Sequence, residues 1–476
     1  MNWTQLMCSE RLRQYTKTGT SGDLRSEFEK DYHRIISSPS FRRLQDKTQV
    51  FPLDKSDFIR TRLTHSLEVS SFAKSLGQSV GARIINEKLA DDFDESVRSG
   101  ICDVLQCAGL IHDIGNPAFG HFGESAIQDW FKKNLGLLEY NGRKLTDILT
   151  EQMQKDFFRF EGNTQALRVV TRLHFLVDEH GMNLTKALLA TIIKYPCSSL
   201  ESNKECGDIK LKKMGYFYAD KDSFDDIQSS CGLNGSRHPL AFLLEAADDI
   251  AYNTADIEDA VKKGNLNYRI LRDELDKWSK KIPQGPKAET FTETAGRLDR
   301  YYNRALENGY DNPDLYAVQN WIVRVQGVLI NCATDTFIND YNEIMSGRFK
   351  KDLIGASNGE YIVKALSDAA YRYVFISKPI LKLEVAASAI FDFLLERYTD
   401  AFLYYDTPYW KENRTALRDK LTMLMSENYL RIYHKYSEGK SEEEKLYLRL
   451  LMVTDYICGM TDSYAKRMYQ ELNGVI

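Results

Sequence analysis

Hydrophobic positions along this chain recur mainly at steps of three and four residues, which is the spacing of one face of an α-helix. The clearest run lies between about residues 61 and 85. Its apolar positions are Val69, Phe72, Ala73, Leu76, Val80 and Ile84. A second run covers about residues 99–113 and a third about residues 239–263, and each ends close to a glycine. The pattern predicts three amphipathic helices whose apolar stripes face a common core.

The rest of the chain also favours helix. Further helices are expected near residues 385–398 and 442–456, and the 476 residues include only 10 prolines. Residues 195–237 are rich in Ser, Lys, Asp and Gly, so we expect a long surface excursion there, with one short ordered turn near Gly215, Tyr216 and Phe217. Such a segment could form a lid or a subunit contact. We predict an all-α fold in which residues 1–476 form a single unit.

Charge and cysteine usage narrow the class of protein. The formal net charge of -5 and the pI near 6.0 give no general attraction to nucleic acid or to an anionic membrane. The eight cysteines lack CxxC spacing, which fits reduced thiols better than a disulfide framework. The N-terminus has no apolar signal stretch, and no segment approaches the ~20 apolar residues of a membrane span. We therefore expect a cytoplasmic protein with no membrane partner.

Four ionisable side chains interrupt the apolar stripes. His65 lies on the stripe of the first predicted helix. His112 lies on that of the second, with Asp113 beside it at the helix end, and Asp248 lies on the third. A buried carboxylate needs a compensating partner, and one divalent cation would satisfy all four groups. The mixed nitrogen and oxygen set suits Mg²⁺ or Mn²⁺, with Fe, Co or Ni as alternatives, and leaves coordination positions for water and phosphate.

Simpler interpretations compete with this site. A single histidine on an apolar face is usually a core residue, and an isolated His-Asp pair is equally unspecific. The ordered set of three inward-pointing positions favours a hydrolytic metal site. Asp249 is the alternative fourth ligand, but it shares a helix face with Glu245 and Asn253, whereas Asp248 follows the apolar stripe.

Six longer strings surround these residues: FRRLQDKTQVFP (41–52), RTRLTHSLEV (60–69), HDIGNPAFGHFGESAI (112–127), FEGNTQALR (160–168), EAADDIAYNTADIEDAV (245–261) and DYICGMTDSYA (455–465). The order H, HD, D resembles the HD phosphohydrolase superfamily, and the strings together resemble the bacterial dGTPases over nearly the whole chain. The resemblance implies an HD-domain helical core over residues 60–264, with additional C-terminal helices over 265–476. It also implies a hexamer that hydrolyses dGTP at the α-phosphorus to deoxyguanosine and inorganic triphosphate.

A histidine and a glutamate follow the His-Asp pair. His121 lies in a loop or at a new helix start after Gly115-Asn116-Pro117, and Glu124 three residues later can orient and charge it. The pair resembles the catalytic histidine and acidic partner of the family. Because a nucleoside 5′-oxygen is a poor leaving group, we expect His121 to act as the acid that protonates it. The alternative is an exposed polar residue in a glycine-rich turn.

Two cations are candidates for binding the triphosphate. Arg62 lies one helical turn before His65, where its planar fork suits phosphate oxygens. The alternative for Arg62 is a solvated side chain at a helix start. Lys194 precedes Tyr195 at a helix end and resembles a family lysine that meets phosphate.

The sugar contacts are implied by the resemblance alone. Gln49, in the string KTQVF, matches a family glutamine that reads the 3′-hydroxyl. Tyr252 and Asp256 share a helix face with Asp248 and are expected to line the sugar and exclude a 2′-hydroxyl. Tyr252 would equally serve as a core aromatic.

Other functions remain in competition with a dGTPase. Within the superfamily, the alternatives are a dNTP triphosphohydrolase of broader base choice and an HD-type 5′-nucleotidase, which would release orthophosphate. A third class is a nucleic-acid-binding regulator, because some dGTPases bind single-stranded DNA. The acidic composition disfavours that class, which needs a basic groove with stacking aromatics.

Overall fold

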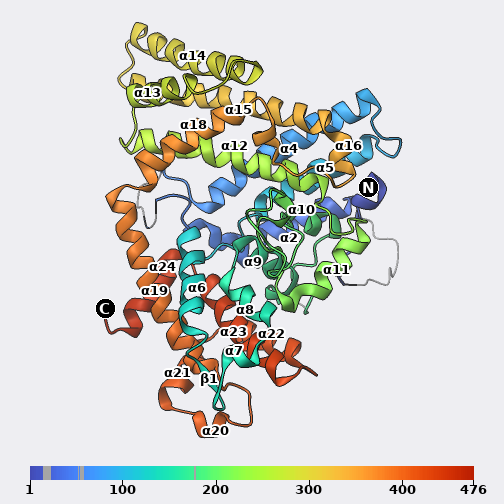
Figure 1. Cartoon of the computed structure of the whole chain (residues 1–476), viewed down its shortest axis with the longest axis vertical. Helices are drawn as coiled ribbons and strands as arrows, with labels where there is room; N and C mark the ends of the chain where they lie inside the picture. Colours follow the sequence, from blue (N-terminus) through green and yellow to red (C-terminus); the bar gives the residue numbers. More distant parts are fainter. Residues whose placement is uncertain (14–22, 52, 54–57, 176–177, 476) are drawn as a thin grey trace.

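The computed structural model describes residues 1–13, 23–51, 53, 58–175 and 178–475, and these residues are mainly helical (Figure 1). The predicted all-α fold is confirmed. One small sheet is present in this part of the chain, in which β1 (Glu139–Tyr140) pairs antiparallel with β2 (Arg143–Lys144). No helix among the described residues combines the length and the apolar character that crossing a membrane requires.

Three helices form the centre of the molecule, and they correspond to the three predicted amphipathic runs. They are α4 (Arg62–Glu87), α5 (Glu95–Ile111) and α12 (Pro239–Lys262). Helix α4 starts with a capping box, in which Thr61 and Thr64 each bind the other's backbone amide. Helix α5 begins earlier than expected, at Glu95, because the side chain of Asp94 accepts a hydrogen bond from the backbone amide of Val97.

Glycines allow α4 and α5 to pack closely. A Cβ atom at Gly109 would lie 2.5 Å from the Cα atom of Ser70, and one at Gly77 would lie 2.7 Å from Leu105 Cδ1. At Gly109 the contact is with backbone, which cannot yield to a side chain, whereas at Gly77 the Leu105 side chain would have to shift. The close approach brings the rings of His65 and His112 to a centroid distance of 5.3 Å.

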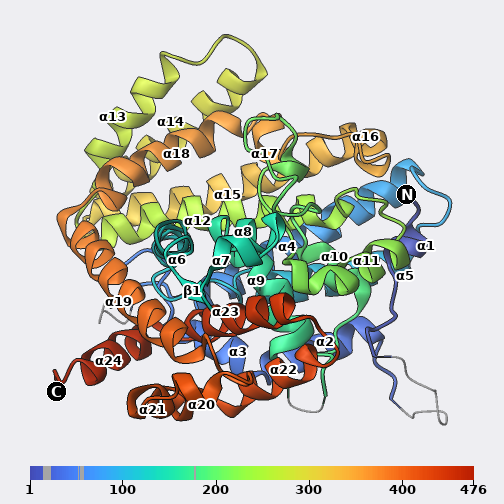
Figure 2. The same ribbon diagram turned by 60° about the horizontal axis from the view of Figure 1, so that its bottom comes forward.

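The remaining helices surround this centre in two groups (Figures 1 and 2). One group, α13 (Tyr268–Ser279), α14 (Pro286–Glu307), α15 (Pro313–Asn339) and α18 (Glu360–Ala370), lies beyond α12. Helix α19 (Lys378–Phe402) then runs along one side of the molecule to the second group, α6 (His121–Asn134), α8 (Glu151–Phe158), α22 (Glu427–Ser437), α23 (Glu442–Cys458) and α24 (Asp462–Leu472). Helices α19 and α23 contain the predicted segments 385–398 and 442–456.

The structure describes further helical elements around these groups. They are α1 (Trp3–Leu6), α2 (Glu27–Ile36), α3 (Pro39–Arg42), η1 (Arg43–Asp46), α7 (Leu145–Ile148), α9 (Gly162–Arg168), the π-helix η2 (Val169–Leu173), α10 (Lys186–Ile192), η3 (Ile209–Leu211), η4 (Tyr218–Asp220), α11 (Lys221–Ser230), α16 (Tyr341–Met345), α17 (Leu353–Ala356), the π-helix η5 (Tyr371–Phe375), α20 (Trp410–Asn413) and α21 (Ala416–Leu424).

The hydrophobic core consists of two clusters. The first contains the buried faces of α4, α5, α12 and α15, and the second joins α6 and α8 to α19, α22 and α23. The division of the chain into residues 60–264 and 265–476 stays a prediction. All eight cysteines are free thiols.

The expectation for residues 195–237 is wrong. This segment contains η3, η4 and the ten-residue helix α11, and the side chains of Met214, Phe217 and Ile227 are fully buried. The ring of Tyr216 stacks on that of Phe224 at a centroid distance of 4.1 Å. The apolar residues of this segment show no helical period because they are spaced irregularly among Ser, Lys and Asp. The segment is a packed part of the fold.

The close contact at Gly109 generates a stability prediction. Gly109→Ala should lower the free energy of unfolding by about 1–3 kcal/mol, because the added methyl group must separate α4 from α5. The matched control is Gly327→Ala in α15, where nothing lies within 4 Å of the added carbon, and alanine should stabilise the helix by about 0.5–1 kcal/mol. Urea unfolding followed by circular dichroism measures both. Equal unfolding midpoints for the two variants would contradict the packing argument.

Candidate metal centre and active site

The structure brings the four predicted metal ligands together. One ligand atom from each of His65, His112 and Asp113 lies within 4.8 Å of the others. Asp248 Oδ1 lies 3.2 Å from His65 Nε2 and 3.4 Å from His112 Nε2. Helix α4 carries the first histidine, the C-terminal end of α5 carries the His-Asp pair, and α12 carries Asp248.

The chemistry of this cluster fits a divalent cation. His112 Nδ1 donates a hydrogen bond to the carbonyl oxygen of Gly109 at 2.8 Å, which directs Nε2 toward the carboxylates. Within the described residues, that buried Nε2 makes no hydrogen bond of good geometry, although Asp248 Oδ1 lies 3.4 Å and Asp113 Oδ1 lies 3.5 Å away. Burial lowers the pKa of His112, but Asp113 and Asp248 outweigh burial and raise it. The site therefore favours a positive charge between the imidazoles and the carboxylates.

The geometry favours Asp248 over Asp249 as the fourth ligand. Burial opposes ionisation of Asp248, but Lys194, whose Nζ lies 2.8 Å from Asp248 Oδ2, and His112 hold its pKa well below the usual range. Burial and the neighbouring Glu245 raise the pKa of Asp249 well above it. A metal ligand must be deprotonated, and of the two only Asp248 faces the imidazoles.

Arg62 and Asn116 hold the carboxylate of Asp113. The guanidinium of Arg62 donates to Asp113 Oδ2, and Asn116 Nδ2 donates to Asp113 Oδ1 at 2.7 Å. The chain passes closely over Arg62 at Gly120, where a Cβ would lie 2.4 Å from Arg62 Nη2. Gly120 also adopts a left-handed φ of 59°, so a side chain at this position would be disfavoured twice.

His121 and Glu124 form the predicted pair. His121 is the first residue of α6, and its Nδ1 lies 2.8 Å from Glu124 Oε2. Glu124 Oε1 accepts a hydrogen bond from the backbone amide of Gly162 at 2.6 Å. The His121 side chain is 77% exposed, whereas that of Glu124 is 7% exposed. The hydrogen bond to Glu124 raises the pKa of His121, so the imidazole retains its proton to a higher pH than a free histidine does.

Comparison with known proteins identifies the family. The model of the HD domain family matches residues 62–195, which include His65, His112 and Asp113. The chain is 48% identical to a deoxyguanosinetriphosphate triphosphohydrolase-like protein of Listeria innocua, and the match covers 100% of both chains. It is 31% identical to a deoxyguanosinetriphosphate triphosphohydrolase of Klebsiella pneumoniae, over 100% of this chain and 98% of that one. The chain belongs to the deoxyguanosinetriphosphate triphosphohydrolase family. The predicted resemblance is confirmed.

Two of the three residues predicted to meet the sugar, Gln49 and Asp256, have unsatisfied polar atoms. In the part of the chain that the structure describes, Gln49 Oε1 and Asp256 Oδ1 are buried without a hydrogen-bond partner. Burial raises the pKa of Asp256 well above the usual range, and Tyr252 lies one turn before Asp256 on the same face of α12. Buried acceptors without partners are expected where a ligand supplies the missing donors.

The structure shows an ion pair, between Glu161 and Lys213, that the sequence did not predict. Glu161 Oε2 accepts from Lys213 Nζ at 2.7 Å, and Glu161 directly precedes the Gly162 amide that binds Glu124. Burial and the nearby Glu124 raise the pKa of Glu161 to about 7. Glu161 lies within the string FEGNTQALR, whereas Lys213, inside residues 195–237, gave no local signal.

The predicted ligand set is tested by comparing two adjacent carboxylates. Asp248→Asn should weaken Mn²⁺ binding by more than the about 10- to 100-fold that is typical of losing an outer-shell partner, because the amide removes a charged ligand. Asp249→Asn, the matched control, should leave Mn²⁺ affinity unchanged. Isothermal titration calorimetry on the metal-stripped full chain measures both constants. Reversal of the two results would make Asp249 the ligand.

Proposed function

We propose that this protein hydrolyses dGTP at the α-phosphorus and releases deoxyguanosine and inorganic triphosphate. One observation carries the proposal: a cluster of two imidazoles and two carboxylates lies near a His-Glu pair, in a chain whose full-length relatives are named for this reaction. The metal-ligand cluster draws on three helices, α4, the end of α5 and α12, and the His-Glu pair lies on a fourth, α6.

The ligands proposed for a divalent cation are His65, His112, Asp113 and Asp248. Such an ion, when bound, polarises a phosphoryl oxygen and lowers the pKa of the attacking water. Mg²⁺ or Mn²⁺ is the proposed ion, with Fe, Co or Ni as alternatives, because the donor set mixes nitrogen and oxygen.

Arg62 and Lys194 are proposed to bind the triphosphate. Each now donates to one of the carboxylates of the cluster, Arg62 to Asp113 and Lys194 to Asp248, so both cationic groups border the proposed metal position. A guanidinium can grip two phosphate oxygens at once, whereas an ammonium group acts as a point charge. Together they would fix the chain of phosphates relative to the cluster.

The deoxyribose is proposed to lie against Gln49, Tyr252 and Asp256. The buried Gln49 Oε1 would accept a hydrogen bond from the 3′-hydroxyl, and Asp256 Oδ1 would form a hydrogen bond with the same sugar. Tyr252 would fill the space beside the 2′-carbon. A 2′-hydroxyl would then be excluded by packing.

His121 is the proposed general acid. Its protonated imidazole would donate a proton to the 5′-oxygen as the bond from that oxygen to the α-phosphorus breaks, so that deoxyguanosine leaves as a neutral alcohol. The Nδ1 hydrogen bond to Glu124 fixes the ring and leaves Nε2 to donate. The buried Glu124 would stabilise the cationic form of the ring.

Several finer properties belong to the same proposal. A homohexamer is proposed on the resemblance, and a cytoplasmic location fits the eight free cysteines. Single-stranded DNA is the weaker partner hypothesis, because the net charge is -5. A broader dNTP triphosphohydrolase and an HD-type 5′-nucleotidase are the alternative activities.

A panel of substrates tests the activity, the sugar choice and the cleaved bond together. The four dNTPs and GTP are incubated with the protein and either Mg²⁺ or Mn²⁺, and the products are separated by chromatography. We expect deoxyguanosine and inorganic triphosphate from dGTP, and slower turnover of GTP. Equal rates for all four dNTPs would support broad specificity, and orthophosphate as the product would support a nucleotidase.

The raised pKa of His121 predicts a pH effect. Glu124→Gln removes the carboxylate that keeps His121 protonated, so the pKa of His121 should fall. Because the general acid works only when protonated, the alkaline limb of the kcat profile should move to lower pH. The control is Asp129→Asn, at an exposed position of the same helix, which should leave the profile in place. An unmoved alkaline limb in Glu124→Gln would remove His121 from the acid role.

A further inference from the structure

A buried carboxylate near the C-terminus joins two loops of the site. Asp462 is the first residue of α24 and is 2% exposed. Its Oδ2 accepts from the backbone amide of Thr48 at 3.0 Å and also from the Thr48 hydroxyl. Its Oδ1 accepts from the backbone amide of Phe119 at 2.9 Å. One side chain therefore ties together two segments that are about 70 residues apart in sequence.

Each of these segments carries a residue of the proposed site. Thr48 directly precedes Gln49, and Phe119 lies two residues before His121. The first segment is also tied to the start of α4, because the backbone amide of Arg62 donates to the carbonyl of Lys47 at 3.0 Å. The proposed sugar contact Gln49, phosphate contact Arg62 and acid His121 therefore lie next to segments that meet at one place.

The backbone at Phe119 requires support. Phe119 has a φ of 60°, and Gly120 follows with a φ of 59°. The left-handed region is unfavourable for a residue with a bulky side chain, and it persists where the surroundings fix it. The hydrogen bond from the Phe119 amide to Asp462 fixes the turn from which α6 and His121 start.

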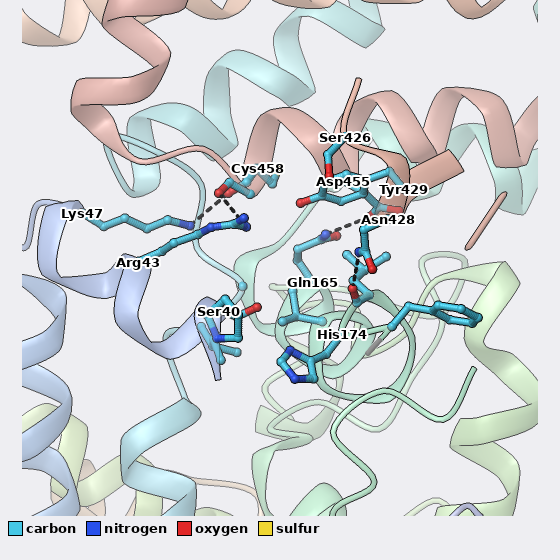
Figure 3. Close-up of a pocket in the computed structure, with 17 residues that line it drawn as sticks. Ser40, Arg43, Lys47, Gln165, His174, Ser426, Asn428, Tyr429, Asp455 and Cys458 are labelled. Carbon is cyan, nitrogen blue, oxygen red and sulfur yellow. Dashed lines mark hydrogen bonds between the residues drawn. The ribbon is translucent and has the colours of Figure 1, made fainter. Parts of the chain in front are cut away.

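A second long-range contact, made by Lys47, lies beside that of Asp462. The buried Lys47 Nζ donates to the carbonyl oxygen of Asn116 at 2.5 Å and to that of Cys458 at 2.9 Å. Figure 3 shows Lys47 reaching the end of α23 at Cys458. The string DYICGMTDSYA therefore contacts the first loop through Cys458 and both loops through Asp462, which accounts for a motif that the proposed chemistry does not use.

We propose that Asp462 is a positioning residue, which sets the distance between the sugar contact at Gln49 and the acid His121. The kinetic test of this inference rests on the proposed function. The hydrogen bonds of Asp462 with Thr48 and Phe119 are a property of the folded chain and do not depend on that function. A carboxylate suits this task because both of its oxygens accept hydrogen bonds. Asparagine has nearly the same shape but only one acceptor oxygen, so it can bind Thr48 or Phe119 through that oxygen but not both.

The experiment compares Asp462→Asn with a control for the stability of α24. Thr461→Ala removes the N-cap of α24, where Thr461 Oγ1 accepts from the Tyr464 amide, and touches neither loop. Hydrogen exchange by mass spectrometry is measured on peptides covering residues 46–50 and 117–121 of the full chain. The kcat/KM values of dGTP and 2′,3′-dideoxy-GTP are measured with Mn²⁺, and their ratio reports the advantage of the 3′-hydroxyl.

Asp462→Asn should accelerate exchange in both peptides and lower kcat/KM for dGTP about 10- to 100-fold, because small misplacements of reacting groups cost rates of this size. The ratio of the kcat/KM value for dGTP to that for 2′,3′-dideoxy-GTP should also fall. Thr48→Val, which loses only the hydroxyl bond, should lower the ratio in the same direction. Thr461→Ala should change the melting temperature but neither the exchange of the two peptides nor the ratio.

The possible outcomes distinguish a failure of this inference from a failure of the proposed function. Wild-type protein that releases no triphosphate from dGTP would overturn the function, and the exchange measurement would still decide whether Asp462 ties the loops. Unchanged hydrogen exchange in Asp462→Asn would show that the Asp462 side chain does not hold the two loops together. Faster exchange with an unchanged kcat/KM and ratio would overturn the positioning role, as would the same kinetic losses in Thr461→Ala.

Discussion

Compensating charge is the constraint at the point where α4, α5 and α12 converge. The rings of His65 and His112 are buried beside the carboxylates of Asp113 and Asp248, where unpaired charge is expensive. The protein itself supplies one cation for each carboxylate, from Arg62 and Lys194. In the proposed function a divalent ion in the cluster would take over this compensation, which frees both side chains for phosphate oxygens.

Periodicity revealed the residues that helices aim inward. His65 and Asp248 follow the apolar stripes of α4 and α12, so the 3.6-residue repeat alone predicted that they would converge. The repeat carries no information about distance across the core. The tight contact of α4 with α5 at Gly109, on which the separation of the two imidazoles depends, is visible only once both helices are in place.

Residues outside the stripes escaped prediction for two physical reasons. The segment 195–237 buries its side chains through irregular turns, so no period marks Lys213 or its contact with Glu161. Asp462 contacts Thr48 and Phe119 across 414 and 343 residues of sequence, and no local pattern can report such a partner. Its string was conspicuous only through resemblance, which identified a family and gave no role.

The two hydrophobic clusters explain why such long-range ties are needed. The histidines and Asp248 are carried by helices of the first cluster, whereas His121 begins α6, whose buried face belongs to the second. The position of the proposed acid relative to the proposed metal ligands therefore depends on how the two clusters meet. The chain crosses from the first cluster to the second along residues 112–121, among other places, and at this junction Lys47 and Asp462 bind the backbone. Since a packed cluster resists internal deformation, fixing this short junction fixes the orientation of α6 as a whole, and with it the acid.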